Sequence, residues 1–90
     1  MKIKSIRLIN GDQIVCELSD ESTDTIKIKK GFVVSIDQES NRLRFNPVAP
    51  FAVSDVEIEI AKINVTFVCD ASYWIVDQYN DLIEGKLPQQ

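Results

Sequence analysis

The chain has 90 residues, of which 44% are hydrophobic, and its formal net charge is −4. A single domain of this length buries only about 60–65% of its unfolded surface, so assembly into an oligomer or closure into a tight barrel would add to its stability. The hydrophobic content excludes a disordered chain, and the absence of an apolar run of ~18 residues excludes a membrane-spanning helix. Residues 1–7 lack the apolar stretch and cleavage site of a signal peptide, so a cytoplasmic protein without membrane contact is expected.

The first half of the chain predicts strands and turns in regular succession. Apolar runs at residues 3–9 and 13–18 flank Asn10-Gly11, and this arrangement is the strongest short-range signal for a β-hairpin. An acidic loop follows over 19–24. Strand patterns then appear at 25–29, 32–36 and 42–45, and Gly31 between the first two predicts a bulge or a sharp bend.

The second half predicts two more strands and one helix. Pro47 and Pro50 favour an edge or crossing segment, after which residues 56–60 and 63–69 read as strands. An amphipathic helix is predicted over 71–84, with Asp70 as its N-cap and Gly85 as its stop, followed by a tail at 85–90. Five or six short strands at this spacing indicate a small SH3-like or OB-like barrel, since closure removes exposed edges.

The residue types present argue against catalysis. The chain has no histidine, which excludes His-based general bases and triads. Its three glycines are far apart, so no phosphate-binding loop is expected. The two cysteines, Cys16 and Cys69, each lie in an apolar run and are predicted to be buried, reduced thiols rather than a disulfide or a metal site. We therefore expect no enzyme activity, no cofactor and no metal.

Charge is distributed unevenly along the chain. Residues 1–45 carry eight Lys/Arg against seven Asp/Glu, whereas residues 46–90 carry two against seven. Binding to nucleic acid must therefore rest on a local site, because it is driven by phosphate neutralisation. Two pairs, Lys27 with Lys29 and Arg42 with Arg44, form either a positive stripe on one sheet surface or ordinary outward-facing charges.

The predicted helix carries three aromatic residues, Tyr73, Trp74 and Tyr79. They serve either as core packing across a barrel mouth or as a contact to a neighbouring subunit, because aromatic residues are enriched at such interfaces. The pattern by itself does not separate these two roles.

Two parts of the chain resemble the motifs of the Sm/LSm family. Residues 6–18 with their glycine turn, the acidic loop 20–24 and the apolar Ile26 and Ile28 resemble the first motif. Residues 58–68, two strands that meet at a very short turn, resemble the second. The segment Asn46-Pro47-Val48-Ala49-Pro50-Phe51, together with the C-terminal helix, is similar to small Sm-like proteins of tailed phages, including cyanophages.

This resemblance implies an Sm-like barrel over residues 1–70, strongly bent and built of five antiparallel strands, with the helix 71–84 packed on it or on a neighbouring subunit. It also implies a homo-oligomeric ring of about five to seven subunits, in which the strand at 56–60 pairs with the strand at 65–69 of the next copy. The expected interface residues are Val56, Ile58, Ile60, Val65 and Phe67.

The resemblance further implies single-stranded RNA as a ligand. By this resemblance the family's RNA-contacting asparagine would fall near Thr25, and its Arg-Gly pair would fall near Ala61-Lys62. The expected RNA-binding residues are Thr25, Lys62, Asn64, Lys27 and Lys29. Two functions stay open: an RNA-binding ring in RNA metabolism, located in the host cytoplasm if the protein is viral, or an oligomeric scaffold that binds proteins and no nucleic acid.

Overall fold

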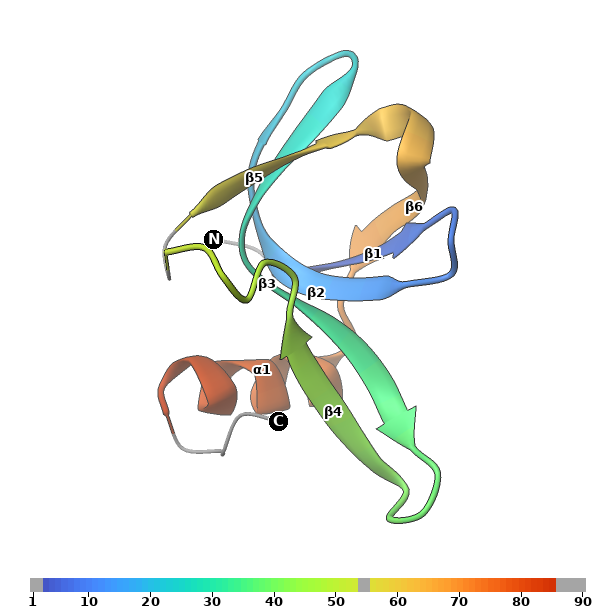
Figure 1. The fold of residues 1–90 in the computed structure, drawn as a ribbon, viewed down its shortest axis with the longest axis vertical. Coiled ribbons are helices and arrows are strands. Elements are labelled where there is room, and N and C mark those ends of the chain that lie inside the picture. The colour runs from blue at the N-terminus through green and yellow to red at the C-terminus, as the bar shows by residue number, and fades with distance from the viewer. Residues whose placement is uncertain (1–2, 54–55, 86–90) are drawn as a thin grey trace.

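The computed structural model describes residues 3–53 and 56–85, which form one antiparallel sheet and a C-terminal helix (Figure 1). The strands are β1 Ile3–Leu8, β2 Gln13–Glu21, β3 Thr25–Asp37, β4 Arg42–Pro47, β5 Glu57–Ala61 and β6 Val65–Asp70. A short 3-10 helix, η1 Lys62–Asn64, joins β5 to β6, and the helix α1 spans Tyr73–Ile83. The predicted mostly-β fold with a C-terminal helix is confirmed, while residues 86–90 of the predicted tail lie outside the described residues.

The sheet has six strands and stays open, which corrects the prediction of a closed five-stranded barrel. Its order is β4-β3-β2-β1-β6, with β5 also paired to β3. Strand β3 runs through Gly31 as one strand of 13 residues. It is long enough to pair with two strands along the same edge, β5 over Thr25 to Lys29 and β4 over Phe32 to Asp37, which gives the sheet its sixth strand. The curved strands enclose much of a barrel (Figure 1), but β5 and β6 are not paired to each other in the described chain.

A bulge in β3 decides which side chains face which side of the sheet. Val15 pairs with Phe32, whereas Glu17 pairs with Lys29, so β3 holds one extra residue between these pairs. The predicted bulge near Gly31 is therefore confirmed, although the positive φ of 51° belongs to Lys30. One inserted residue reverses the side to which the following side chains point. Even-numbered residues of β3 therefore face one side of the sheet before the bulge and the other side after it.

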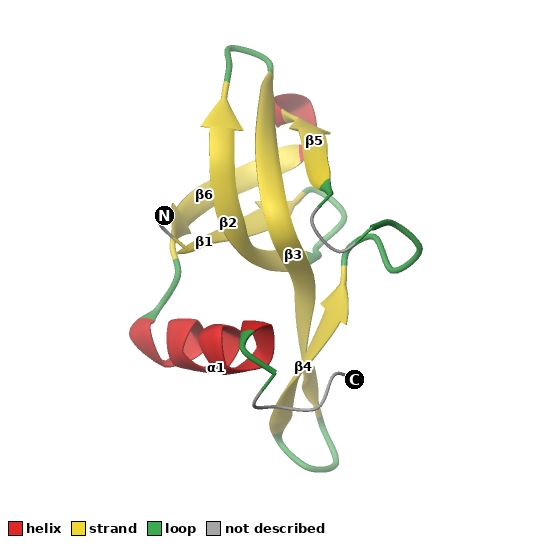
Figure 2. Cartoon of the chain, turned by 90° about the vertical axis from the view of Figure 1, so that its left-hand side faces the viewer, coloured by secondary structure: helices red, strands yellow, loops and turns green. Residues whose placement is uncertain are grey.

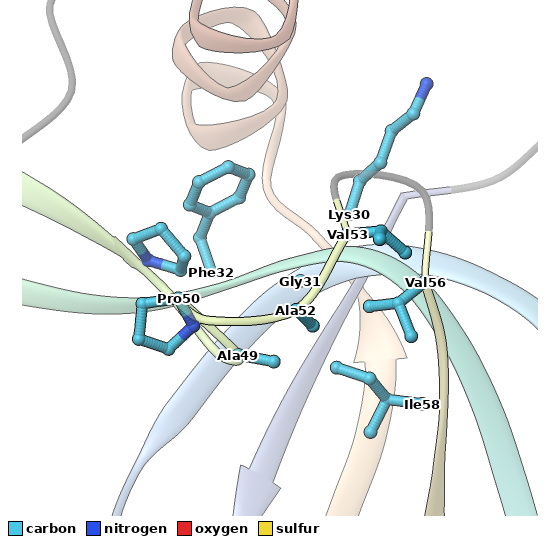
Figure 3. Close-up of a pocket in the computed structure, with 10 residues that line it drawn as sticks. Lys30, Gly31, Phe32, Ala49, Pro50, Ala52, Val53, Val56 and Ile58 are labelled. Carbon is cyan, nitrogen blue, oxygen red and sulfur yellow. The ribbon is translucent and has the colours of Figure 1, made fainter.

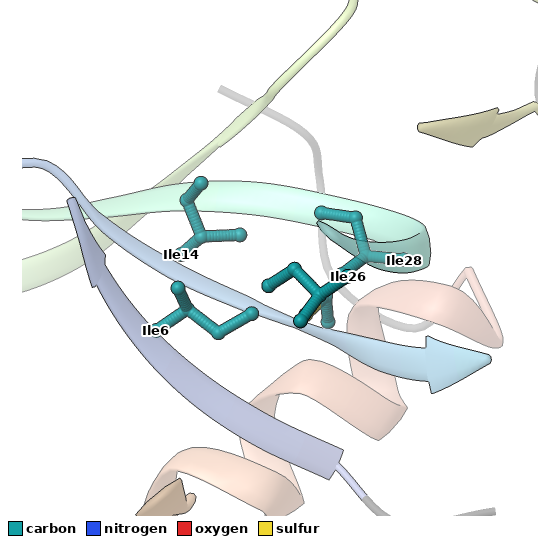
Figure 4. Packing of buried hydrophobic residues seen from close by; sticks show 5 residues of the cluster. Ile6, Ile14, Ile26 and Ile28 are labelled. Atoms are coloured by element: carbon teal, nitrogen blue, oxygen red, sulfur yellow. The ribbon is translucent and has the colours of Figure 1, made fainter. Parts of the chain in front are cut away.

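The first hydrophobic core fills the concave side of the bent sheet. Its buried members come from β1, β2 and β3: Ile6, Ile14, Cys16, Ile26 and Ile28. Figure 4 shows the four isoleucines gathered in this core. Gly31 borders this core, since a Cβ at that position would lie 3.0 Å from Ile28 Cδ1 and 3.2 Å from Val48 Cγ2. Glycine therefore lets the segment after β4 pass close to β3.

The second core lies on the opposite face of the sheet and is covered by α1. Val15, Phe32 and Phe45 contribute from the strands, and Tyr79 and Leu82 from the helix. Phe32 meets Tyr79 edge to face, with ring centroids 6.0 Å apart, a favourable geometry for aromatic pairs. The helix thus packs on the sheet of its own chain, and Tyr79 serves as core.

The turns and helix ends follow the local signals, with one exception. Gly11 (φ 95°) closes the β1–β2 hairpin, and Gly85 (φ 79°) ends α1, as predicted. The helix begins at Tyr73 with Ser72 as its N-cap, so the prediction of Asp70 as N-cap was wrong. Asp70 is instead the last residue of β6, where its carboxylate accepts a hydrogen bond of 2.6 Å from Lys4 Nζ.

The left-handed backbone at Lys30 gives a first testable prediction. Lys30→Val is expected to lower the free energy of unfolding by about 1–2 kcal/mol, because β-branched residues tolerate positive φ poorly. Lys30→Gly is expected to change it by less than about 1 kcal/mol, since glycine relieves the strain but gains freedom in the unfolded chain. Urea unfolding followed by circular dichroism measures both, and equal stability of the two variants would contradict a strained Lys30.

Candidate functional site

Two strands at opposite ends of the curved sheet have open backbone edges. Within the described residues, β5 pairs only with β3, and β6 pairs only with β1. Lys62 donates its N–H to Asp24 O (2.8 Å), and Ala71 donates its N–H to Ile3 O (3.2 Å). Since successive N–H groups of a strand alternate in direction, the N–H groups of Glu59 and Val68 point away from the paired strand toward the open edge.

Strand β6 is unusually exposed for its composition. Its sequence is VTFVCD, and every residue after Val65 is exposed. Phe67 retains 40% and Val68 retains 39% of their accessible surface, although they face opposite sides of the sheet. An apolar edge strand that its own chain leaves uncovered is a natural site for pairing with another chain.

The two cysteines differ in their surroundings. Cys16 lies in the concave core, and burial raises the pKa of its thiol to about 12. Cys69 is exposed on β6, which corrects the prediction that both thiols are buried. The reason is that the apolar run around Cys69 belongs to an edge strand, and no other segment described in the structure covers it.

The predicted interface residues divide into two groups. The side chains of Ile58, Ile60 and Val65 pack against the concave core of their own subunit, so β5 offers a neighbour chiefly its backbone edge. Phe67 is exposed. Val56 precedes β5 and is half-buried. Their contacts with a second subunit stay a prediction.

Val56 also lines a small cavity beneath the segment between β4 and β5 (Figure 3). The cavity has a volume of about 240 Å³, and its lining comes mainly from apolar residues and prolines, including Pro50, Val53 and Ile58. Figure 3 shows the Lys30 side chain extending away from the space. The cavity therefore lacks the converging polar groups that fix a small ligand.

Of the five predicted RNA-binding residues, the structure brings Thr25 and Lys62 together and places Asn64 elsewhere. Thr25 opens β3 next to Lys62 of η1, as the hydrogen bond from Lys62 N–H to Asp24 O shows. Asn64 lies instead beside the β1–β2 turn, where its carbonyl accepts the N–H of Ile9 (2.9 Å). Both polar side chains at the shared site already have acidic partners, since Lys62 Nζ lies 2.9 Å from Glu21 Oε2 and Thr25 Oγ1 donates to Glu59 Oε2 (3.2 Å).

Lys27 and Lys29 lie between carboxylates on the helix side of the sheet, the face opposite the concave core. Lys27 stands opposite Asp20 on β2 and Glu59 on β5. Lys29 stands opposite Glu17 and Glu57 in the same way. Two lysines thus share this face with four carboxylates, which weakens the attraction of the face for phosphate.

Of the two arrangements left open for Lys27, Lys29, Arg42 and Arg44, the structure has separate outward-facing charges and no shared positive stripe. Ile26 and Ile28 occupy the concave core, so Lys27 and Lys29 face the helix side of the sheet. On β4, Leu43 and Phe45 face the helix side, so Arg42 and Arg44 point to the opposite side. The bulge at Lys30 is the cause, since it reverses the faces between the two halves of β3.

A groove that sequence reasoning missed lies on the helix side of β6. Its volume is about 420 Å³, and it is bordered by Phe67 and Cys69 of β6, Trp74 of α1, and Ile36 and Leu43 of the β3–β4 hairpin. Among its described lining residues only Asp70 carries a charge. The one sequence signal for it was the aromatic helix face, because Tyr73 and Trp74 remain 82% and 57% exposed while Tyr79 is buried.

Neither the described residues nor comparison of the sequence with known proteins assigns a membrane helix, a metal site or a family. No helix in the described part of the chain is long and apolar enough to cross a membrane. Across residues 3–53 and 56–85, no three His, Cys, Asp or Glu side chains are grouped so that they would hold a metal ion. No protein-family model matches the sequence, and a search of the curated proteins returns no match.

Proposed function

We propose that this protein is a ring-forming, Sm-like assembly module that joins copies of itself edge to edge and presents the ring as a scaffold for other proteins. The single observation behind this proposal is the apolar strand β6, exposed on both faces and carrying an open N–H edge. A partner strand would cover this edge and satisfy its backbone groups.

The edge of β5 is the best candidate for the complementary strand. Strand β4 also lies at an edge of the sheet, but it ends in Pro47, which has no N–H to donate to a partner strand. Pairing of β5 with β6 of the next copy is head to tail, and a head-to-tail contact that closes into a ring leaves neither edge open. About five to seven subunits would agree with the Sm-like resemblance.

Charge favours a protein scaffold over a nucleic-acid ring. The two outward lysines of β3 are flanked by four carboxylates, and Lys62 is paired with Glu21. The chain as a whole carries a net charge of −4. Phosphate would have to displace carboxylates that the lysines already face, which lowers the electrostatic gain of RNA binding.

Single-stranded RNA is the second candidate ligand because Thr25 and Lys62 lie together at one end of the sheet. In this alternative Lys62 contacts phosphate, and Thr25 hydrogen-bonds a base or a 2′-hydroxyl. Fluorescence anisotropy with labelled oligo-U and oligo-A at low and moderate salt tests it. Saturable binding that Lys62→Ala abolishes would support the RNA function, and no binding at low salt would reject it.

Assembly itself is tested by light scattering on the wild type and on two variants of β6. The wild type is expected to have the mass of a closed oligomer. Val68→Pro is expected to have the mass of a monomer, because proline removes the outward N–H and places its ring at the open edge. Val68→Ala is the matched control, since it shortens the same side chain, keeps the N–H, and should still assemble.

Circular dichroism checks that both Val68 variants keep the strand content of the wild type. A folded Val68→Pro that assembles like Val68→Ala would show that the β6 edge is not the contact. A wild type that remains monomeric at all accessible concentrations would reject the proposed function.

A further inference from the structure

The segment before β5 displays a side chain that its own subunit does not cover. Residues 48–53, which follow β4, carry no charge in a chain that is 27% charged. Within this segment Phe51 is fully exposed, and Val53 is 70% exposed. A fully exposed phenylalanine on a short uncharged segment is an unused apolar anchor, the kind of residue that commonly dominates the energy of a protein–protein contact.

The groove beside β6 has the matching properties. It is lined by apolar and uncharged polar side chains with Asp70 as its one charged lining residue in the described chain. Its volume of about 420 Å³ falls within the roughly 300–1,000 Å³ of pockets that hold small ligands. The Asp70 carboxylate already accepts a hydrogen bond from Lys4 Nζ, so an uncharged aromatic side chain would enter the groove without leaving this charge unpaired.

The anchor and the groove lie on opposite sides of the molecule. Figures 1 and 2 both place the segment between β4 and β5 on one side and β6 with the start of α1 on the other. Complementary features on opposite sides cannot meet within one subunit. They can meet between successive copies arranged head to tail.

The position of the anchor along the chain agrees with edge pairing. If β5 of one copy runs antiparallel to β6 of the next, the start of β5 lies beside the end of β6. The end of β6 is where Asp70 and Ala71 line the groove. Phe51 precedes the start of β5 by a few residues, so edge pairing would place its segment on the same side as the groove of the neighbour.

We propose that Phe51 of each subunit inserts into the β6–α1 groove of the adjacent subunit and packs there against Phe67 and Trp74. This inference rests on the proposed ring and adds a side-chain contact that stabilises the interface between its subunits. The backbone edges of β5 and β6 set the alignment, and the Phe51 ring supplies apolar burial. The occupant of the groove is therefore a second copy of this chain.

Native Cys69 provides a direct test, because it lines the groove that Phe51 is proposed to enter. If Phe51 enters the groove, Phe51→Cys is expected to bring a second thiol close to the neighbour's Cys69, since a disulfide requires Cα atoms less than about 7 Å apart. Mild oxidation is expected to produce a ladder of covalent oligomers on a non-reducing gel. Ile9→Cys is the matched control, since Ile9 is an exposed apolar residue of the β1–β2 turn, away from the groove.

Cys69→Ser added to Phe51→Cys is expected to abolish the ladder. A parallel readout uses Phe51→Ala, which should raise the concentration needed for half-assembly by at least about tenfold, the effect of losing one anchor residue. It should also shift the emission of Trp74, the single tryptophan, toward that of a water-exposed indole. Phe51 is fully exposed, so these substitutions leave the fold of the subunit intact.

Cross-linking and light scattering together distinguish a wrong Phe51 contact from a wrong ring proposal. If the wild type assembles but Phe51→Cys cross-links no more than Ile9→Cys, Phe51 does not enter the groove, and the ring still stands. If the wild type is monomeric by light scattering, the ring and the Phe51 contact are both rejected.

Discussion

Tyr79→Ala is expected to lower the free energy of unfolding by about 3–5 kcal/mol, the range for removing a buried aromatic side chain. Tyr79 has no accessible surface and joins α1 to the sheet by packing on Phe32, in the buried cluster that also holds Phe45. A domain of this size has a total stability at the lower end of about 5–15 kcal/mol. The variant should therefore be largely unfolded at room temperature, as urea titration and far-ultraviolet circular dichroism will measure.

Tyr79→Phe is the matched control and separates the ring from the hydroxyl. The Tyr79 hydroxyl donates a hydrogen bond of 2.6 Å to the carbonyl of Lys30, at the bulge of β3. Losing this bond leaves the partly buried carbonyl without its donor and should cost about 1–2 kcal/mol. If Tyr79→Ala were as stable as Tyr79→Phe, ring packing would not be what holds α1 on the sheet.

The wild type and Tyr79→Phe are also expected to differ in how their stability depends on alkaline pH. Burial, followed by the nearby Glu17 and Cys16, raises the pKa of Tyr79 above its ordinary value of 10.0. The folded state then holds a proton that the unfolded state loses, so this contribution is complete below pH 10 and falls as the pH rises. Above pH 10 the wild type should lose up to about 1.4 kcal/mol per pH unit more than Tyr79→Phe.

Local signals in the sequence were enough to predict most of the elements. The Asn10-Gly11 turn, the alternation around Ile26 and Ile28, and the glycine stop at Gly85 each act within a few residues, and each appears in the structure. The bulge near Gly31 was also predictable. What the pattern did not reveal was its consequence, because the reversal of faces in β3 becomes visible only once the register against β2 is known.

The candidate site depended on contacts between residues far apart in sequence. Lys27 appears basic in the sequence, yet in the sheet it meets Asp20 and Glu59, which come from two other strands. Cys69 lies in an apolar run, yet it is exposed because β6 is an edge strand. The groove joins β6, α1 and the β3–β4 hairpin. None of these neighbours is specified by local periodicity, so sequence patterns did not predict them.

Two variants that each block one edge are expected to form a dimer only when they are mixed. Val68→Pro closes the β6 edge and leaves β5 free. Glu59→Pro closes the β5 edge in the same way, since the N–H of Glu59 points away from β3. Each variant alone should have the mass of a monomer by light scattering, and an equimolar mixture should have twice that mass.

The mixture distinguishes a head-to-tail contact from a symmetric one. In a head-to-tail contact the free β5 of Val68→Pro pairs with the free β6 of Glu59→Pro, and the chain stops there because both remaining edges are blocked. In a symmetric contact of β6 with β6, Glu59→Pro alone would instead form a homodimer, without Val68→Pro being added. Glu59→Ala controls for the lost hydrogen bond from Thr25 Oγ1, keeps its backbone N–H, and should assemble like the wild type. A mixture that stays monomeric while the wild type is a ring would therefore reject β5–β6 pairing as the contact that builds it.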